Sequence, residues 1–462
     1  MVSKHRVIIL GGGFGGLYAA KALRAAPVDV TLIDRRNHHL FQPLLYQVAT
    51  GSLSPGEIAA PLRGVLGRQQ NTRVLLGEVV DIEPVAKRVV LRDGACFEYD
   101  WLIVATGTQS FYYGNEQWRE WAPSLKSVEE ATAIRHKILY AFEAAERVCE
   151  PNERCPWLTL VIVGAGTTGL ELAGALAEIA RHTLKYDFRS IRPEDAQIIL
   201  LDGSPRVLPT YPEDLSEKAE QSLQRLGIQV RKQVKVVGID KDGVTFQTHE
   251  GTERLAAKTV LWAGGVTASA FGRTLARRTG AETDRSGRIP VQPDLTLSNH
   301  PDIYIVGDLA LAFRSEGRPL PGVAQVAMQQ GAYAAQAIVK RLDGPKELSP
   351  FRYVDKGDMA VIGRAAAVAN LFGLHVSGFV AWLIWLFIHL MYLVEFQNRL
   401  LVFIQWGFQY LTFSRGARLI TGRVVSDSIL IGESTQSVTG GTDSQATRPE
   451  EPVGRSKNAE EV

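Results

Sequence analysis

Two glycine-rich turns constrain the fold of this 462-residue chain more than any other feature. The first occupies residues 11–16 with the sequence GGGFGG, and the second occupies residues 164–169 with the sequence GAGTTG. Both fit the pattern G-x-G-x-x-G, which holds a dinucleotide pyrophosphate when a strand precedes it and a helix follows. One such turn alone is weak evidence. Two turns in suitable contexts predict two nucleotide sites in one chain.

The first turn has the full context of a dinucleotide site. An apolar run precedes it, an alanine-rich helical segment follows, and a second apolar run ends at Asp34. In that arrangement Gly11 makes the tight turn and Gly13 lets the backbone approach the pyrophosphate, while the helix N-terminus offers N–H groups to the phosphate oxygens. Asp34 is then placed to accept a hydrogen bond from a ribose hydroxyl.

The second turn follows an equally apolar run and opens a leucine-rich helical segment. Its acidic residue, Asp202, comes later than the usual spacing of about twenty residues, because a polar insertion at residues 181–195 lengthens the crossover. An acid at this place favours the free 2′-hydroxyl of NADH over the 2′-phosphate of NADPH. Arg206, close by in the sequence, weakens that preference.

Charge and cysteine content exclude several function classes. The formal net charge of +2 argues against a nucleic-acid partner, which would need a basic stripe. Cys96, Cys149 and Cys155 have no metal-ligand spacing, so no metal site is expected. The N-terminus enters the first strand directly, so no signal peptide is predicted.

A C-terminal apolar block predicts contact with a membrane. Residues 379–394 carry no formal charge, but a spanning helix needs about 20 apolar residues. The next segment is amphipathic, which leaves three interpretations: a buried core helix, a single span, or a helix pair lying in the membrane interface. We favour the interfacial anchor, with aromatic side chains at the interface and arginines that bind anionic headgroups. In the amphipathic segment, the polar stripe comprises Asn398, Gln405, Gln409 and Thr412, and the apolar side comprises Leu400, Leu401, Phe403, Ile404, Phe408 and Leu411. The aromatic residues expected at the interface are Trp382, Trp385, Trp406 and Tyr410. The arginines expected to bind headgroups are Arg415, Arg418 and Arg423.

Further motifs carry a family resemblance. The order of the two turns, the Ala-Thr-Gly sequence at residues 105–107 and the Gly-Asp pair at residues 307–308 resemble the two-dinucleotide-binding-domain flavoprotein reductases. The sequence NHHLFQPLLYQVA at residues 37–49, AQVAMQQG at residues 324–331 and the C-terminal block are more specifically similar to the type II NADH:quinone oxidoreductases. The resemblance covers about residues 5 to 425.

The resemblance implies that the first unit binds FAD and the second binds NADH. By the same match, Asp308 accepts a hydrogen bond from the ribityl chain, although an N-cap role for the segment after it is the structural alternative. The implied FAD-binding residues are Gly11, Gly13, Phe14, Gly15, Gly16, Asp34, Arg35, Thr106, Gly107, Asp308, Ala324 and Gln325. The implied NADH-binding residues are Gly164, Gly166, Thr167, Thr168, Gly169, Glu171, Asp202 and Gly264.

Four residues are predicted to act at the reacting end of the site. Glu171 lies where the nicotinamide must pass to reach the flavin, as a positioning residue, although the helix dipole alone would favour an acid there. Gln325 and Gln329 present their amides on one helix face, which suits the carbonyl groups of a quinone. Lys356 is a weaker candidate for the same region, with a plain surface lysine as the alternative. Adjacent His38 and His39 are expected to shape the loop under the flavin.

The predicted fold is α/β, with two Rossmann-like dinucleotide-binding domains and a C-terminal helical membrane-anchoring segment. The predicted divisions are 1–112 and 283–345 for FAD, 113–156 for a helical linker, 157–282 for NADH, 346–376 for a quinone-side connecting segment, 377–430 for the anchor and 431–462 for a disordered tail.

The expected function is a non-proton-pumping NADH:quinone oxidoreductase with tightly bound FAD, on the cytoplasmic face of the cell membrane and possible as a homodimer. Hydride passes from NADH to FAD, and two electrons and two protons then reach menaquinone or ubiquinone. A sulfide:quinone reductase is the alternative enzyme, but it would need a redox cysteine in the C-terminal half, and no cysteine follows Cys155. A membrane-bound FAD/NADH redox sensor is the alternative of another class.

Overall fold

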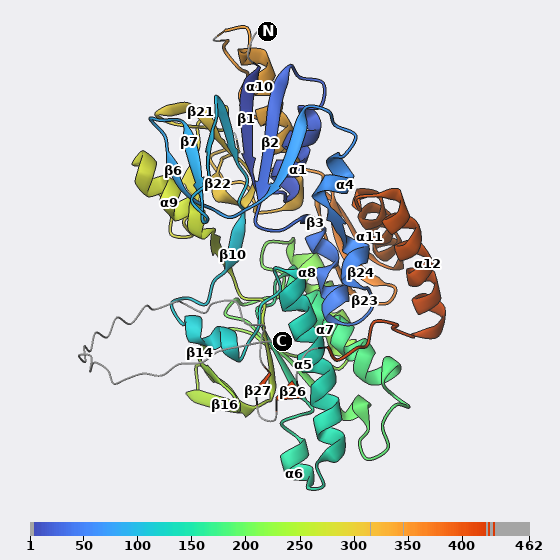
Figure 1. Cartoon of the computed structure of the whole chain (residues 1–462). Coiled ribbons are helices and arrows are strands. Elements are labelled where there is room, and N and C mark those ends of the chain that lie inside the picture. Colours follow the sequence, from blue (N-terminus) through green and yellow to red (C-terminus); the bar gives the residue numbers. More distant parts are fainter. Residues whose placement is uncertain (1–3, 315, 345, 422–423, 426–427, 430–462) are drawn as a thin grey trace, which may run out of the picture. The chain divides into compact units, whose positions relative to one another are not determined.

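The computed structural model describes residues 4–314, 316–344, 346–421, 424–425 and 428–429. The described residues from 4 to 421 form one compact unit (Figure 1). In the second unit, β26 (Val424–Val425) and β27 (Ser428–Ile429) pair antiparallel. The predicted disordered tail, 431–462, lies outside the described residues.

The first nucleotide-binding layer is a six-stranded sheet with the order β20-β21-β9-β1-β2-β5. All neighbours pair parallel except β20 and β21, which pair antiparallel. Helices α1 and α10 pack together on one face, and an antiparallel sheet β6-β7-β8 with α9 covers the other (Figure 1). The bounds are β1 His5–Leu10, α1 Phe14–Ala22, β2 Val28–Asp34, β5 Thr72–Leu76, β6 Val79–Glu83, β7 Arg88–Leu91, β8 Cys96–Glu98, β9 Trp101–Val104, α9 Ala270–Thr279, β20 Thr296–Leu297, β21 His300–Ile305 and α10 Ala324–Arg341.

The second nucleotide-binding layer is a four-stranded parallel sheet with the order β13-β12-β11-β17. Helices α7, α8 and the long α5 pack with it, and the antiparallel sheet β14-β15-β16 joins the core of its other face. The predicted α/β class with two Rossmann-like units is thereby confirmed. The bounds are α5 Val128–Arg147, β11 Thr159–Val163, α7 Thr167–Glu178, β12 Gln197–Leu201, α8 Glu213–Arg225, β13 Gln229–Arg231, β14 Lys235–Asp240, β15 Gly243–Gln247, β16 Thr252–Ala256 and β17 Thr259–Trp262.

Short elements join the two layers and carry part of the site. Strands β10 (Thr108–Ser110) and β18 (Val266–Ala268) pair antiparallel where the chain passes from one layer to the other. After β2, the chain forms β3 (His38–Leu40), α2 (Leu45–Ala49), α3 (Pro55–Ile58) and β4 (Ala59–Pro61), and α2 packs on α5.

The segment predicted to be a simple connection contains an antiparallel sheet. Strands β23 (Asp358–Gly363), β24 (Ala366–Leu371) and β25 (Leu374–Gly378) form it, and β23 packs on α7. The contact is close because α7 has a glycine there: a Cβ on Gly174 would lie 1.6 Å from the carbonyl oxygen of Ile362. This sheet places the two C-terminal helices beside the second nucleotide-binding unit.

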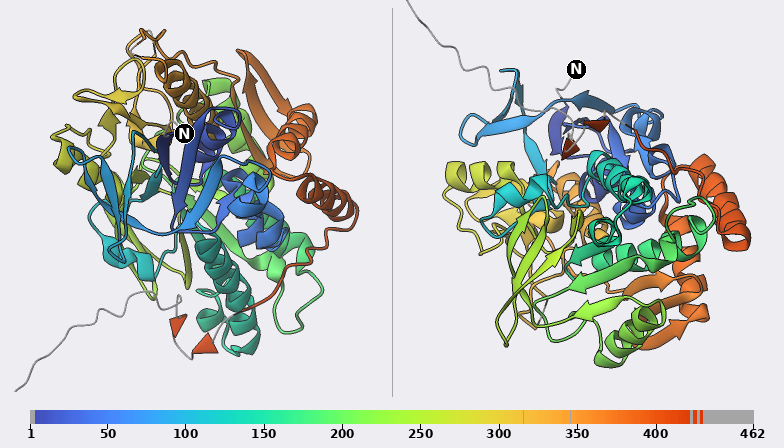
Figure 2. Two further views of the ribbon diagram at one scale, coloured as in Figure 1. Left: turned by 45° about the horizontal axis from the view of Figure 1, so that its top comes forward. Right: turned by 90° about the horizontal axis from the view of Figure 1, so that it is seen from below.

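Helices α11 (Phe379–Tyr392) and α12 (Phe396–Thr412) form one edge of the unit in each view (Figures 1 and 2). Helix α12 directs its polar stripe inward except for Thr412, which is exposed. Asn398 donates to the carbonyl oxygen of Gly56 at 3.4 Å and Gln409 to that of Ser52 at 2.5 Å. The apolar side points outward, with Phe408 at 59% and Leu411 at 79% exposure. Within the described ranges, no helix is both long and apolar enough to cross a bilayer.

Candidate functional site

The first glycine-rich turn connects β1 to α1, and its backbone leaves room only for glycine at two positions. Gly11 has a φ of 101°, and a Cβ there would lie 2.4 Å from the carbonyl oxygen of Ala105. A Cβ on Gly16 would lie 1.8 Å from the carbonyl oxygen of Gly11. Gly13 differs, because a Cβ there meets no atom within 4 Å. The turn is therefore packed on the protein side and open at Gly13, where a phosphate approaches.

The end of α1 beside this turn is ready to bind an anion. Its N-cap is Gly13, which supplies no side-chain hydrogen bond, and its first turn has no acidic residue. The free N–H groups and the helix dipole both favour a phosphate. Gly11, Asp34 and Thr106 follow the carboxyl ends of neighbouring parallel strands, so the residues predicted to hold FAD meet at one sheet edge. These residues fit the cofactor.

Asp34 organises the turn through backbone hydrogen bonds. One carboxylate oxygen accepts from the N–H of Gly12 at 2.5 Å, and the other accepts from that of Arg36 at 2.7 Å. A carboxylate oxygen has two acceptor sites, so each retains capacity for a ribose hydroxyl. Arg35, also predicted to contact FAD, is exposed.

Three other predicted FAD residues lie where segments distant in sequence meet. The Thr106 hydroxyl lies 2.7 Å from that of Ser269, and the Thr108 hydroxyl donates to Asp308 at 3.1 Å. Asp308 lies within a short 3-10 turn, residues 307–309, whose N-cap is Val306, so the alternative N-cap role is not observed. Ala324 is the first residue of α10.

His39 contacts the first glycine-rich turn through its imidazole ring. Its Nδ1 lies 2.9 Å from the carbonyl oxygen of Gly12, and its ring makes an edge contact with Phe14 at 5.0 Å between centroids. Burial lowers the pKa of His39 to about 4, so the imidazole is neutral. His39 therefore has the structural surroundings of a loop-shaping residue.

The second turn repeats the geometry of the first. Gly164 has a φ of 108°, and a Cβ there would lie 2.6 Å from the carbonyl oxygen of Ala263. A Cβ on Gly169 would lie 1.8 Å from the carbonyl oxygen of Gly164, whereas one on Gly166 meets nothing within 4 Å. Gly166 caps α7 without a side-chain hydrogen bond, and Thr167 and Thr168 open that helix. The second turn therefore has the same uncapped helix N-terminus, open at its middle glycine, as the first.

Asp202 holds the same place in the second unit as Asp34 in the first. It accepts from the N–H of Ala165 at 2.5 Å and from that of Ser204 at 2.6 Å. The long insertion before it therefore changes the spacing in sequence without moving the acid. Gly264 follows the end of β17, next to the parallel strand that precedes the turn. Arg206 donates instead to the carbonyl oxygen of Pro209 at 3.0 Å.

The two predicted glutamines lie on one face of α10 and contact the segment before β23. Gln325 donates through Nε2 to the carbonyl oxygen of Gly357 at 3.1 Å, while its buried Oε1 has no hydrogen-bond partner among the described residues. Gln329 donates to the carbonyl oxygen of Val354 and accepts from its N–H, both at 2.9 Å. Gln325 thus keeps a free acceptor, whereas the amide of Gln329 braces the loop. The exposed Lys356 donates to the Tyr392 hydroxyl at 3.0 Å.

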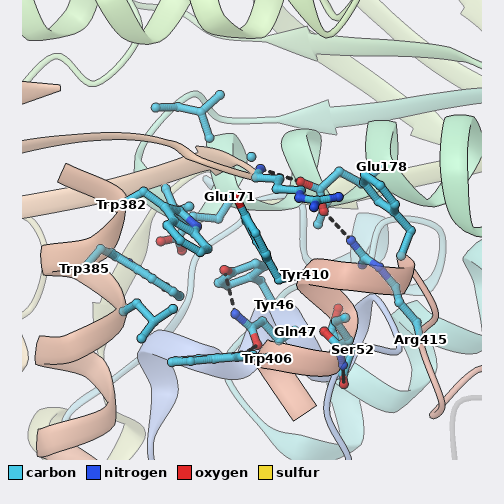
Figure 3. A pocket seen from close by; sticks show the side chains of 18 of the residues that line it. Tyr46, Gln47, Ser52, Glu171, Glu178, Trp382, Trp385, Trp406, Tyr410 and Arg415 are labelled. Atoms are coloured by element: carbon cyan, nitrogen blue, oxygen red, sulfur yellow. Dashed lines mark hydrogen bonds and ion pairs between the residues drawn. The ribbon is translucent and has the colours of Figure 1, made fainter. Parts of the chain in front are cut away.

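A cavity of about 120 Å³ lies between the second nucleotide unit and the C-terminal helices (Figure 3). Helix α7 supplies Glu171, α2 supplies Tyr46, and α11 and α12 supply aromatic rings. Trp385 and Trp406 are 5.5 Å apart and Trp382 and Tyr410 are 5.2 Å apart between centroids. The lining residues are Tyr46, Gln47, Ser52, Glu171, Ala175, Glu178, Thr183, Val361, Ile362, Gly363, Arg364, Trp382, Trp385, Leu386, Trp406, Gln409, Tyr410, Phe413 and Arg415.

Glu171 is the buried acid of this cavity, with 8% of its surface exposed. Burial raises the pKa of its carboxyl well above the ordinary value, although a hydrogen bond from the Val361 backbone opposes the shift. Burial thus favours the neutral form of this acid. Gln325, Gln329 and Lys356 do not line the cavity. The two glutamines contact the segment just before β23 from α10, and Lys356 lies on that segment, whereas the cavity is lined by the other end of β23.

Two expectations for the C-terminal block are wrong. Trp385 and Trp406, predicted to lie at the membrane interface, are 3% and 8% exposed, because their rings form the cavity wall. Arg415, predicted to bind headgroups, is buried and pairs with Glu178 at 2.7 Å. Arg418 is half-buried and pairs with the exposed Asp187. Arg423 lies outside the described residues.

Sequence reasoning missed Tyr46, Gln47 and Glu178 as cavity residues. Glu178 follows Glu171 by two helical turns, so the spacing alone places both acids on one face of α7. That signal was available in the sequence. Tyr46 and Gln47 belong to the motif at residues 37–49 but had no assigned role at a quinone site.

Comparison with known proteins places this geometry in a wider group. Residues 5–331 match the model for pyridine nucleotide-disulphide oxidoreductases, and residues 356–415 match that for the NDH2 C-terminal domain. The chain is 46% identical over 424 residues to the type II NADH:quinone oxidoreductase Ndh of Mycobacterium tuberculosis, covering 90% of each chain, and 45% identical over 430 residues to NdhA of the same organism, covering 91% of this chain and 90% of that one. The structure of NDH2 from Plasmodium falciparum in complex with NADH shares the fold, with a TM-score of 0.79 at 21% identity, over 89% of this chain and 99% of that one.

Proposed function

The chain belongs to the type II NADH:quinone oxidoreductase family, and from that premise we propose that it transfers electrons from NADH to a membrane quinone through bound FAD. The observation that carries this proposal is the aromatic cavity that lies along α7 and is lined on its other side by α11 and α12. One wall of the cavity comes from the helix whose N-terminus forms the second pyrophosphate site, and the other comes from helices with an exposed apolar surface. Donor and acceptor sites are therefore joined by one rigid element.

The two pyrophosphate sites have different tasks. The Gly11 turn, with Asp34 and Asp308, holds FAD without a covalent bond, and the Gly164 turn, with Glu171 and Asp202, binds NADH as substrate. When bound, FAD supplies the chemistry of accepting hydride and releasing two electrons. The protein positions both partners and limits access of water, since Glu171 and the rings around it are buried.

Gln325, Gln329 and Lys356 remain our candidates for the flavin's quinone side. The free Oε1 of Gln325 is the group that supports this assignment, because a buried polar atom without a partner is costly unless a ligand uses it. Gln329 contributes by holding the loop that carries Val354. Lys356 lies on that loop and reaches α11 through Tyr392.

The outward apolar faces of α11 and α12 support peripheral attachment to the cytoplasmic face of the cell membrane. Phe379, Phe387, Phe403 and Phe408 are each at least 50% exposed, and such a surface is costly in water. We expect sedimentation with liposomes, and Phe403→Glu with Phe408→Glu should abolish it while keeping flavin content. Sedimentation equilibrium in detergent tests the homodimer; a monomer would exclude it.

Anaerobic NADH titration tests the proposal directly. NADH should bleach the flavin absorbance, and menaquinone or ubiquinone analogues should restore it, with one quinone reduced for each NADH oxidised. Flavin that NADH does not bleach would refute the donor half, and reduced flavin that no quinone reoxidises would refute the acceptor half.

A further inference from the structure

We propose that Tyr46 binds the accepting quinone as a hydrogen-bond donor, and that Gln47 and Trp406 fix the direction of this donor. The inference rests on the proposed quinone reduction and names one substrate contact within it. It concerns a chain of hydrogen bonds that leads from α12 into the cavity (Figure 3).

The chain has one possible direction. The indole N–H of Trp406 donates to Oε1 of Gln47 at 2.7 Å, and an indole nitrogen can only donate. This contact fixes which end of the Gln47 amide carries the oxygen. The amide nitrogen must then face Tyr46, and it donates to the phenol oxygen at 3.0 Å. Tyr46 is therefore an acceptor toward Gln47, and its own O–H proton is left to point elsewhere.

The remaining direction for this proton is the cavity. Within the described part of the chain, the Tyr46 hydroxyl makes the one hydrogen bond with Gln47, in which it accepts. The phenol lines the same cavity as Glu171, and Figure 3 shows both side chains reaching into it. Burial raises the pKa of Tyr46 well above 10, and the nearby Glu171 raises it further, so the hydroxyl stays protonated. It is a permanent donor.

The cavity complements a ligand that has only acceptors. A quinone is a flat ring whose polar groups are carbonyl oxygens, so it needs donors at its edge and aromatic surface on its faces. Trp382, Trp385, Trp406 and Tyr410 supply the surface. Tyr46 supplies an edge donor. Arg415 is less suited to that task, because its guanidinium is already paired with Glu178 and donates to the carbonyl oxygen of Thr50 at 3.1 Å.

The hydrogen bond between Trp406 and Gln47 links the direction of the Tyr46 hydroxyl to the position of α12. Trp406 lies on α12, whose opposite side is apolar and exposed, while Tyr46 lies on α2 under the first nucleotide unit. If α12 shifts, Gln47 loses the contact that fixes its amide, and the Tyr46 proton can turn toward Gln47 instead. Trp406 is thus a positioning residue, and Tyr46 is the group that touches substrate.

The first test is Tyr46→Phe, which removes the donor and keeps the ring. We expect the KM for a soluble short-chain naphthoquinone to rise about tenfold, the effect of one lost hydrogen bond. The rate of flavin bleaching by NADH should be unchanged. Tyr186→Phe is the matched control, since that phenol is 77% exposed and does not line the cavity, and its quinone KM should equal that of the unmodified protein.

The second test separates the effect of Trp406 on the direction of the Tyr46 O–H group from its effect on the packing of the cavity wall. Trp406→Phe and Trp385→Phe remove equal ring area from the same cavity. Only Trp406 donates to Gln47, whereas the Trp385 N–H has no partner in the part of the chain that the structure describes. Trp406→Phe should raise the quinone KM several-fold more than Trp385→Phe. In a protein that already carries Tyr46→Phe, adding Trp406→Phe should raise the quinone KM no more than Trp385→Phe does, because the hydrogen-bond donor that Trp406 positions is already absent.

Three outcomes are distinguishable. An unchanged quinone KM in Tyr46→Phe, with a thermal midpoint equal to that of the unmodified protein, overturns the substrate contact. Equal effects of the two tryptophan variants overturn the positioning role. Failure of the unmodified protein to reduce any quinone would instead refute the proposed function, whatever the variants do.

Discussion

Replacing Gly166 with alanine should separate NADH binding from folding. The backbone at this position, with φ of −74° and ψ of −175°, is accessible to alanine, and a Cβ meets no protein atom within 4 Å. The cost to stability should therefore stay below about 1 kcal/mol, the range of an altered N-cap. The methyl group instead occupies the space through which the pyrophosphate approaches the N-terminus of α7.

The magnitude follows from the hydrogen bonds that the methyl group displaces. Bonds from backbone N–H groups to a charged phosphate contribute about 1.5–3 kcal/mol each. A loss of about 3 kcal/mol corresponds to a rise of roughly 100-fold in the KM for NADH. Steady-state kinetics at saturating quinone measures this change, and the flavin absorbance and thermal midpoint should match those of the unmodified protein.

Two glycine variants provide controls. Gly169→Ala places its Cβ 1.8 Å from the carbonyl oxygen of Gly164, so it should lower the thermal midpoint as well as raise the KM. Gly13→Ala, the equivalent of Gly166→Ala in the first turn, should lose flavin while the protein still folds. An unchanged KM for NADH in Gly166→Ala, or loss of flavin there, would refute the assignment of the two turns.

Three further predictions concern charge. Arg415→Met leaves the partly buried Glu178 without its ion-pair partner, so it should lower the free energy of unfolding by about 3 kcal/mol. Adding Glu178→Gln to this variant should recover part of the loss. Equal thermal midpoints for Arg415→Met and the unmodified protein would contradict this prediction. Because burial lowers the pKa of His39 to about 4, the unfolded chain gains a proton below about pH 6.5 that the folded state rejects, so stability is full above pH 6.5 and falls toward pH 4. Between pH 7 and pH 5, the free energy of unfolding of His39→Asn should fall by up to about 2 kcal/mol less than that of the unmodified protein, as measured by urea titration. Identical decreases in the two proteins would exclude His39 as a cause. Asp202→Asn should raise the ratio of kcat/KM for NADPH to that for NADH about tenfold, since it removes a charge that repels the 2′-phosphate; a constant ratio would show that Asp202 does not select the nucleotide.

The nucleotide-binding half of the fold could be read from the sequence because its signals are local. In each turn, the strand, three glycines and helix lie within a few dozen residues, and the glycines are required by contacts within the same unit, such as that of Gly16 with Gly11. Asp202 also reached its predicted place despite the insertion before it, because the parallel pairing of β11 with β12 sets the register. The sheet β23-β24-β25 was not predicted, because its strands DMAVIG, AAVANL and LHVSG contain several alanines and glycines, which have low strand propensity.

The sequence by itself determined that there are two dinucleotide sites and which residues of α12 share a face. Only the tertiary structure decided which way that face points. Helical periodicity groups Asn398 and Gln409 on one side and Phe408 on the other, but it cannot say whether the polar or the apolar side meets the protein. The polar side does, because unpaired carbonyl oxygens such as that of Ser52 need donors there. The cavity also depended on tertiary structure, because its wall joins residues 46–52, 171–183, 361–364 and 382–415, whose proximity no local pattern records.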